Sequence, residues 1–333
     1  MGTRDRNGSA GARATQGAAA APAPRQLVVE DRGDGQRLDN YLLRECPGVP
    51  KTRLYKAIRK GEVRVNKGRA RPERRLAQGD IVRLPPFVQN TRPASVAPPD
   101  WQRRLDDSIV HEDDDLLVVN KPSGLAVHGG SGLQFGLIET LRSMRPQDRF
   151  LELVHRLDRD TSGLLLVARR PAALRALHAL LRQEGGVDKR YLALVAGRWP
   201  AHLRSSAAPL QRDHLQSGER VVRVAREGRE SLTEFRVQRS SPRLSLIEAR
   251  PVTGRTHQIR VHSAHLGHPL LGEPKYGDAR SEAISAELGL RRLFLHAKSL
   301  SFRLGDRSYR FEAPLDAELG GVIQRAFAAV AAD

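Results

Sequence analysis

The segment His155-Arg-Leu-Asp158-Arg-Asp-Thr-Ser-Gly163 connects two apolar runs, residues 150–154 and 164–168. Each run has the length and side-chain types of a β-strand, so the polar connection is expected to be a loop held by a sheet at both ends. Catalytic groups are often found on such loops, because rigid strands fix their positions. Asp158 and Asp160 lie here among three residues that can carry positive charge, so carboxylate ionisation and orientation can be tuned.

The same residues also fit a turn that only links two strands. Asp160, Thr161 and Ser162 can bond the local backbone, and Gly163 can supply a positive φ. We adopt that interpretation for Asp160, Thr161 and Ser162. For Asp158 the pattern alone leaves a structural and a catalytic role open.

Outward from this segment, residues 106–330 predict an α+β domain. Hairpin-like stretches at 299–304 and 308–311, joined by Gly305-Asp306, indicate antiparallel pairing within a mixed central sheet flanked by helices. The expected strands are residues 116–119, 164–168, 191–195, 244–247 and 293–295, and the expected helices are residues 133–144, 171–183 and 257–266.

A smaller domain is expected over residues 27–86, after an Ala/Gly/Arg-rich tail at residues 1–26 that is expected to be disordered. Two stretches with helical spacing precede two short strand-like stretches in this domain. Thr52 is expected to cap the second helix and Gly61 to end it. Residues 87–105 begin with a run rich in Pro and polar side chains, and are expected to be a linker.

Positive charge is concentrated in the smaller domain. The whole chain has 56 Lys and Arg against 38 Asp and Glu, which favours a polyanionic partner. Residues 31–86 contain 15 basic and 7 acidic residues. The second helix is expected to carry five cations on its solvent face, which indicates nucleic-acid contact rather than an ordinary solvated face. They are Lys51, Arg53, Lys56, Arg59 and Lys60.

Several function classes are disfavoured by absent patterns. The single cysteine, Cys46, excludes an internal disulfide and a zinc site built on cysteines. No run reaches the length of a membrane span and no secretory apolar region is present, so a soluble cytoplasmic protein is expected. The strand and Gly-rich loop over residues 118–130 lack a P-loop pattern, and no dinucleotide-binding glycine pattern follows a strand.

The segment Gly254-Arg-Thr-His-Gln-Ile-Arg260-Val-His262 predicts a helix with Thr256 at its N-cap. The histidines at 257, 262, 265 and 268 do not have the spacing of a known zinc motif, so no metal is expected. A guanidinium such as that of Arg260 can bind a buried carboxylate through two hydrogen bonds and keep it ionised. Tyr191 can be a core aromatic or a surface on which a nucleobase stacks.

Four segments, in this order, resemble the RluA family of pseudouridine synthases. They are Lys121-Pro-Ser-Gly124, His155 to Gly163, the strand that begins at Tyr191, and Gly254 to His262. Residues 126–133, 152–155 and 217–224 look like the branch called large-subunit pseudouridine synthase C, and the basic domain resembles the S4 RNA-binding domain of that branch. The resemblance covers about residues 36–315 and implies an S4-like (αL) domain followed by a pseudouridine-synthase catalytic domain.

The resemblance implies a role for each matching residue. The family's essential aspartate is here Asp158, and the arginine that pairs with it is Arg260. The strand tyrosine, Tyr191, packs under the uracil and is a candidate base. Arg156 fills the gap that the flipped base leaves, because extrusion of a base costs unstacking energy that an inserted guanidinium partly offsets. His155 is assigned with Arg156 to RNA binding, and the substrate pocket is assigned to Arg255, His257 and Ile259.

The implied reaction breaks the C1′–N1 bond of uridine, turns the uracil and forms a C1′–C5 bond. A carboxylate can attack C1′ or C6, or assist deprotonation. No redox or phosphate-transfer step is needed, so neither a cofactor nor a metal is expected. The expected partner is large-subunit (23S-type) ribosomal RNA or its precursor, and a monomer is expected. Two rivals remain: a glycosidase that releases free uracil, and a ribosome-assembly factor that binds RNA without catalysis.

Overall fold

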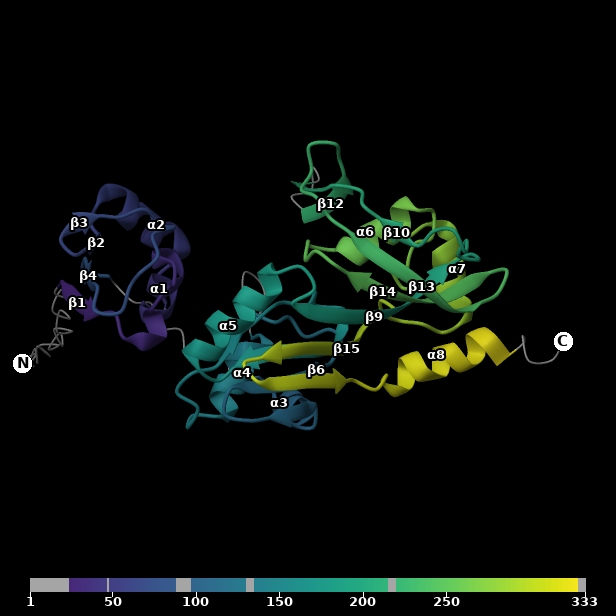
Figure 1. The fold of residues 1–333 in the computed structure, drawn as a ribbon, viewed down its shortest axis with the longest axis horizontal. Helices are drawn as coiled ribbons and strands as arrows, with labels where there is room; N and C mark the ends of the chain where they lie inside the picture. Colours follow the sequence, from purple (N-terminus) through teal and green to yellow (C-terminus); the bar gives the residue numbers. More distant parts are fainter. Residues whose placement is uncertain (1–23, 47, 88–96, 130–134, 215–219, 329–333) are drawn as a thin grey trace, which may run out of the picture. The chain divides into compact units, whose positions relative to one another are not determined.

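A computed structural model describes residues 24–46, 48–87, 97–129, 135–214 and 220–328. The described residues form two compact units that divide near residue 93 (Figure 1). Each unit has its own apolar core. No helix among the described residues is long and apolar enough to cross a membrane.

The first unit is a small antiparallel sheet with two helices. Its strands lie in the order β1-β4-β2-β3. Helix α2 ends at Gly61, whose φ of 72° is left-handed, as predicted. The Thr52 cap is wrong, because the N-cap is Pro50 and Thr52 lies inside the helix. The elements are β1 Arg25–Val28, a short 3₁₀ helix Asp31–Gly33, α1 Leu38–Glu45, α2 Lys51–Lys60, β2 Arg64–Val65, β3 Gly68–Arg69 and β4 Ile81–Leu84.

The structure differs from expectation at both edges of this unit. Arg25 and Gln26 belong to β1, which pairs with β4, and residues 1–23 of the expected tail lie outside the described residues. Phe87 packs in the apolar core of the first unit, and residues 88–96 are not described. The last part of the expected linker is helix α3, Pro99–Asp106, whose Leu105 is fully buried. A proline suits the first turn of a helix, so the Pro-rich composition did not exclude one here.

The second unit is built on a ten-stranded sheet that is mixed and mostly antiparallel, which confirms the predicted fold class. Its strands run β10-β13-β14-β9-β15-β8-β6-β5, with β16 paired to β15 and β7 to β8. Only β15 and β8 pair in parallel among the described strands. The strands are β5 Ile109–Glu112, β6 Leu116–Lys121, β7 Glu152–Leu153, β8 Ser162–Ala168, β9 Val187–Ala196, β10 Ser205–Ser206, β13 Thr233–Ser240, β14 Leu244–Pro251, β15 Leu295–Leu304 and β16 Arg307–Glu312.

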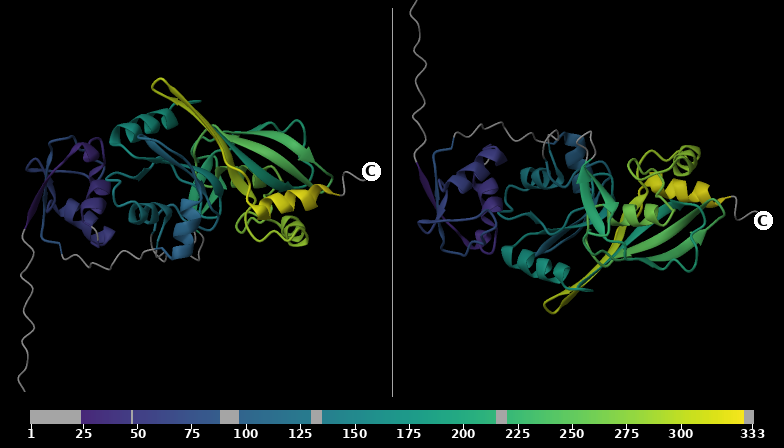
Figure 2. Two further views of the ribbon diagram at one scale, coloured as in Figure 1. Left: turned by 90° about the horizontal axis from the view of Figure 1, so that it is seen from below. Right: turned by 90° about the horizontal axis from the view of Figure 1, so that it is seen from above.

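The predicted hairpin of β15 and β16 is present, with Leu304 opposite Arg307 across Gly305 and Asp306 (Figure 2). A separate two-stranded sheet pairs β11 Leu210–His214 with β12 Arg220–Val224. The predicted helix at residues 133–144 begins only at Leu137, and residues 130–134 are not described. The helices that complete this unit are α4 Leu137–Met144, α5 Pro171–Arg182, α6 Gln258–His265, α7 Ala279–Glu287 and α8 Ala317–Ala328.

Strand β8 anchors the loop that contains Asp158. Every residue of β8 is buried, because two apolar clusters cover its alternate faces. The strand enters the sheet through Gly163, at φ 107°, directly opposite Ala297 of β15. A side chain on Gly163 would meet the backbone of Ala297 at 2.3 Å, so only glycine allows this close approach. The loop that ends here is therefore fixed by the central sheet.

Candidate active site

A cavity of about 880 Å³ opens beside the loop that precedes β8. Its walls come from that loop, from β9, and from the segment that leads into α6. The catalytic and pocket residues expected from the sequence all line this cavity, and so do the expected RNA-binding residues His155 and Arg156. The catalytic and pocket residues are Asp158, Tyr191, Arg255, His257, Ile259 and Arg260. Segments that lie about 100 residues apart in the chain thus meet at one hollow.

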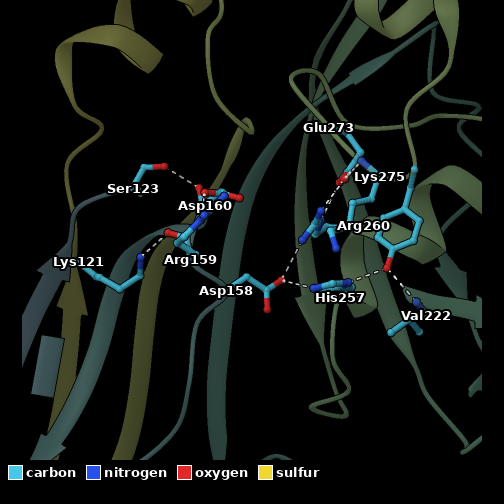
Figure 3. A network of polar contacts seen from close by, with 11 residues as sticks. Lys121, Ser123, Asp158, Arg159, Asp160, Val222, His257, Arg260, Glu273 and Lys275 are labelled. Carbon is cyan, nitrogen blue, oxygen red and sulfur yellow. Dashed lines mark hydrogen bonds and ion pairs between the residues drawn. The ribbon is translucent and has the colours of Figure 1, made fainter. Parts of the chain in front are cut away.

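Asp158 faces a guanidinium that is itself tightly held (Figure 3). Arg260 Nη1 lies 3.3 Å from Asp158 Oδ2. The other side of Arg260 donates two hydrogen bonds to Glu273, Nε to Oε2 at 2.7 Å and Nη2 to Oε1 at 2.5 Å. Burial alone would lower the pKa of Arg260, but the hydrogen bonds and charge of Glu273, and then the charge of Asp158, raise it. Arg260 is therefore a fixed, fully charged donor toward Asp158.

Glu273 was not anticipated from the sequence. Its side chain is completely buried, and its Oε1 also accepts the backbone N–H of Lys275 at 2.9 Å. It lies in a loop after α6, without a periodic pattern or a neighbouring acidic residue to mark it. A buried carboxylate is costly unless paired, so its presence beside Arg260 could only be seen after folding.

His257 occupies a strained position next to Asp158. Its backbone is left-handed, at φ 53° and ψ 21°, where it serves as the N-cap of α6. The predicted N-cap Thr256 is therefore wrong by one residue, and Thr256 Oγ1 instead accepts a hydrogen bond of 2.7 Å from Arg212. His257 Nε2 lies 3.7 Å from Asp158 Oδ2, and Nδ1 lies 2.6 Å from the hydroxyl of Tyr276. Burial lowers the pKa of His257, and the charge of Asp158 opposes this only in part.

Tyr191 lies within β9, and its ring packs between two neighbouring apolar clusters, one that includes Ala193 and Val195 of the same strand and one that includes Leu165 and Val167 of β8. Burial, followed by the negative charge of Asp158, raises the pKa of Tyr191 well above its ordinary value. Its hydroxyl is therefore protonated at neutral pH. The side chain lines the cavity as a neutral aromatic group, which suits contact with a flat base.

The Asp158 loop is also held from its far side by a buried lysine. Lys121 Nζ donates to three backbone carbonyls, those of Pro122 at 3.0 Å, Leu125 at 2.9 Å and Arg159 at 3.0 Å. The Ser123 hydroxyl donates to the Asp160 carbonyl at 2.8 Å. Burial lowers the pKa of Lys121 to about 7, although the charge of Asp160 opposes this. Lys121 belongs to one of the four segments that resemble the family, but no sequence pattern indicates a role for its side chain.

His155, which the resemblance assigns to RNA binding, lines the cavity with an uncharged ring. Its Nε2 accepts the backbone N–H of Leu166 in β8 at 3.2 Å. Burial and the nearby charge of Lys189 lower the pKa of His155 to about 3, so the ring is neutral. Arg156 and Arg255, in contrast, are exposed at the rim of the cavity, and Ile259 is buried in its wall.

The five predicted cations of the first unit lie on α2, and four of them are exposed: Lys51, Lys56, Arg59 and Lys60. Arg53 is different, because it pairs with Glu62 at 2.7 Å and its guanidinium lies over the ring of Phe87. The described residues contain no cluster of three His, Cys, Asp or Glu side chains able to hold a metal ion.

Comparisons with known proteins identify both units. Residues 115–265 match the family model "RNA pseudouridylate synthase", and residues 36–82 match that of the S4 domain. The chain is 52% identical over 310 residues to ribosomal large subunit pseudouridine synthase C of Escherichia coli (strain K12), covering 91% of this chain and 97% of that protein. Identity with the same enzyme of Salmonella typhi is 53% over 305 residues, covering 90% of this chain and 95% of the relative.

Solved structures give the same result for the second unit. Human RNA pseudouridylate synthase domain containing 4 aligns with a TM-score of 0.56 and 26% identity, over 68% of this chain and 95% of its own. Human RNA pseudouridylate synthase domain containing 1 aligns with a TM-score of 0.55 and 27% identity, over 71% of this chain and 98% of its own.

Proposed function

The chain belongs to the RNA pseudouridylate synthase family, and from this premise we propose that it isomerises specific uridines of large-subunit ribosomal RNA with Asp158 as the catalytic residue. The observation that supports this most is the Asp158 carboxylate, which lies at the wall of a cavity within reach of one donor of a buried, fully charged Arg260. Curated relatives about half identical over nine tenths of the chain act, by their names, on the large ribosomal subunit.

The reaction leaves the elemental composition of the nucleoside unchanged, although one hydrogen is exchanged. The C1′–N1 bond breaks, the uracil rotates, C5 bonds to C1′, the hydrogen at C5 leaves as a proton, and N1 gains a proton. Asp158 supplies the carboxylate that attacks C1′ or C6, or assists the deprotonation. Arg260 stabilises negative charge on Asp158 until it reacts. The nucleoside is neither oxidised nor reduced, and no phosphoryl group is transferred, so this chemistry requires neither a cofactor nor a metal.

The remaining cavity residues contact the extruded base and the RNA strand from which it comes. Tyr191 packs against the extruded uracil, together with Ile259. Arg156 and Arg255 lie exposed at the rim, where Arg156 enters the gap in the stack and Arg255 contacts the backbone of the RNA. The first unit adds salt-sensitive affinity that depends little on sequence, through the exposed cations of α2.

Product analysis tests the proposal against its rivals. Purified protein is incubated with an unmodified transcript of large-subunit ribosomal RNA, and the digested RNA and the free bases are quantified. An isomerase gives pseudouridine in RNA of unchanged mass, without free uracil. Release of uracil would instead identify a glycosidase, and RNA binding without either product would identify a non-catalytic binding protein.

A further inference from the structure

A chain of polar contacts connects strand β12 with Asp158. The backbone N–H of Val222 in β12 donates to the Tyr276 hydroxyl at 3.0 Å. That hydroxyl lies 2.6 Å from His257 Nδ1, and His257 Nε2 lies 3.7 Å from Asp158 Oδ2 (Figure 3). Neither Tyr276 nor Val222 lines the cavity, so this path approaches Asp158 from behind its wall.

The contacts determine which ring nitrogen of His257 carries its proton. The ring is neutral, because burial and the charges of Arg260 and Lys275 outweigh the opposing charges of Asp158 and Glu273 in lowering its pKa. A lone pair at Nε2 would point at the carboxylate of Asp158 and repel it, so the proton belongs on Nε2. Nδ1 is then an acceptor, and within the part of the chain that the structure describes the hydroxyl of Tyr276 is the donor that reaches it.

The backbone of His257 indicates that this arrangement is held at a cost. Among the described residues of the second unit, His257 alone has a positive φ without being glycine. A left-handed backbone is unfavourable for such a residue and persists only where surrounding contacts impose it. Here the contact is with Tyr276, whose ring also lies against the Arg260 guanidinium at 5.3 Å.

The hairpin of β11 and β12 supplies the far end of these contacts, because Val222 belongs to β12. A two-stranded hairpin is only marginally stable by itself, so it depends on what it packs against. It has a small apolar contact with α6 and Tyr276, which comprises Leu210, Val222, Val224, Val261 and Tyr276. It is also tied to the residue before His257, because Arg212 donates to Thr256. Arg212 lines the cavity, so RNA that enters the cavity meets the hairpin too.

We propose that His257 is a positioning residue that orients the Asp158 carboxylate through its Nε2–H, and that Tyr276 and β12 set the tautomer on which this depends. A fast reaction therefore requires that the β11–β12 hairpin packs against α6 and Tyr276 as it does in this structure. The inference rests on the proposed function for its kinetic part, and the tautomer can be measured without any substrate.

The kinetic test uses the full chain and an unmodified large-subunit RNA transcript with tritium at uridine C5, which is released as the product forms. Tyr276→Phe keeps the ring and removes the hydroxyl. We expect kcat to fall about 10- to 100-fold, because small misplacement of a reacting group costs that much, while the RNA concentration for half-saturation stays the same. The control is Tyr309→Phe on β16, which removes a hydroxyl that donates to Asp113 outside the cavity. An unchanged kcat in Tyr276→Phe would overturn the proposal.

A second pair of variants separates positioning from folding. His257→Gln keeps an N–H donor near the place of Nε2, whereas His257→Leu does not, and both side chains meet the same left-handed backbone. We expect the glutamine variant to be at least about tenfold faster than the leucine variant. Equal rates in two equally folded variants would contradict a role for the donor.

The tautomer is read from nitrogen NMR of the free protein, with the His257 signals identified by their loss in His257→Gln. The proposal predicts a proton on Nε2 in the wild type. A proton on Nδ1 would overturn it. If the wild type carries the Nε2 proton yet releases no tritium from the transcript, the proposed substrate is wrong. The assignment of the His257 tautomer is then still supported.

Discussion

Glu273 holds Arg260 by two parallel hydrogen bonds, at 2.7 and 2.5 Å, and leaves Nη1 as the guanidinium nitrogen that faces Asp158. Two-point binding fixes the plane of a guanidinium, which a single contact does not. The side chains of both residues are almost entirely excluded from water, so this pair is costly to assemble and costly to break. The positive charge beside Asp158 is therefore placed by a residue that never touches the cavity.

Glu273→Gln tests this placement. The amide keeps the shape of Glu273 but loses its charge and one acceptor, so Arg260 is free to rotate. We expect kcat to fall about 10- to 100-fold with RNA affinity maintained, measured by tritium release. The matched control is Glu287→Gln, which disrupts an equally close but exposed pair with Arg243, at 2.9 and 2.6 Å. A folded Glu273→Gln protein with wild-type kcat would refute the placement.

Lys121 predicts how stability depends on pH. Its pKa is about 7 in the folded protein, against the ordinary value of 10.5 that applies to the unfolded chain. Between these two pH values the unfolded chain therefore binds one proton more than the folded protein does. The free energy of unfolding should therefore rise as pH increases from about 7 to 10, and not change from this source below pH 7. Denaturant titrations of wild type and Lys121→Met should differ in this slope. The exposed Lys60→Met is the control, and identical slopes in all three proteins would exclude the shift.

The raised pKa of Tyr191 predicts that its hydroxyl ionises only at high pH. Burial and Asp158 raise its pKa above the ordinary value of 10.0, so tyrosinate should form there only at higher pH. Ultraviolet titration of wild type against Tyr191→Phe should give equal tyrosinate signals up to pH 10. An additional tyrosinate in the wild type below that pH would show a Tyr191 phenolate ready to act as a base, contrary to its burial.

The cations of α2 predict the salt dependence of RNA binding. Replacing Lys51, Lys56, Arg59 and Lys60 together by alanine should reduce the slope of log affinity against log salt by about 3 if all four contact phosphates. Arg53→Ala should change the slope little, because Arg53 is already paired with Glu62. Filter binding at several salt concentrations measures both. An unaltered slope in the fourfold variant would remove α2 from the RNA interface.

Features set by local pattern could be predicted from the sequence. The strands that flank Asp158, the hairpin of β15 and β16, and the helix end at Gly61 each follow from residue spacing or from a single turn residue. Family resemblance added the meeting of Asp158 with Arg260, which their separation of 102 residues would otherwise conceal.

Features that depend on tertiary contacts could not be predicted. No sequence pattern marks Glu273 or Tyr276. Their contacts with Arg260 and His257 form only when their loop folds against α6. His155 looks like a cation in the sequence, and becomes neutral because β8 and Lys189 surround it. Helix α3 was missed because prolines at its start resemble a linker, although a helix accepts them there.

The role of Asp158 is tested most directly by mapping pseudouridine in large-subunit ribosomal RNA from cells that lack this protein. The cells are complemented with wild type or with Asp158→Asn, which keeps the shape of the side chain and removes its charge. We predict that specific sites lose pseudouridine in the deletion strain and regain it with the wild type alone. Restoration of those sites by Asp158→Asn would contradict the catalytic assignment on which this account is built.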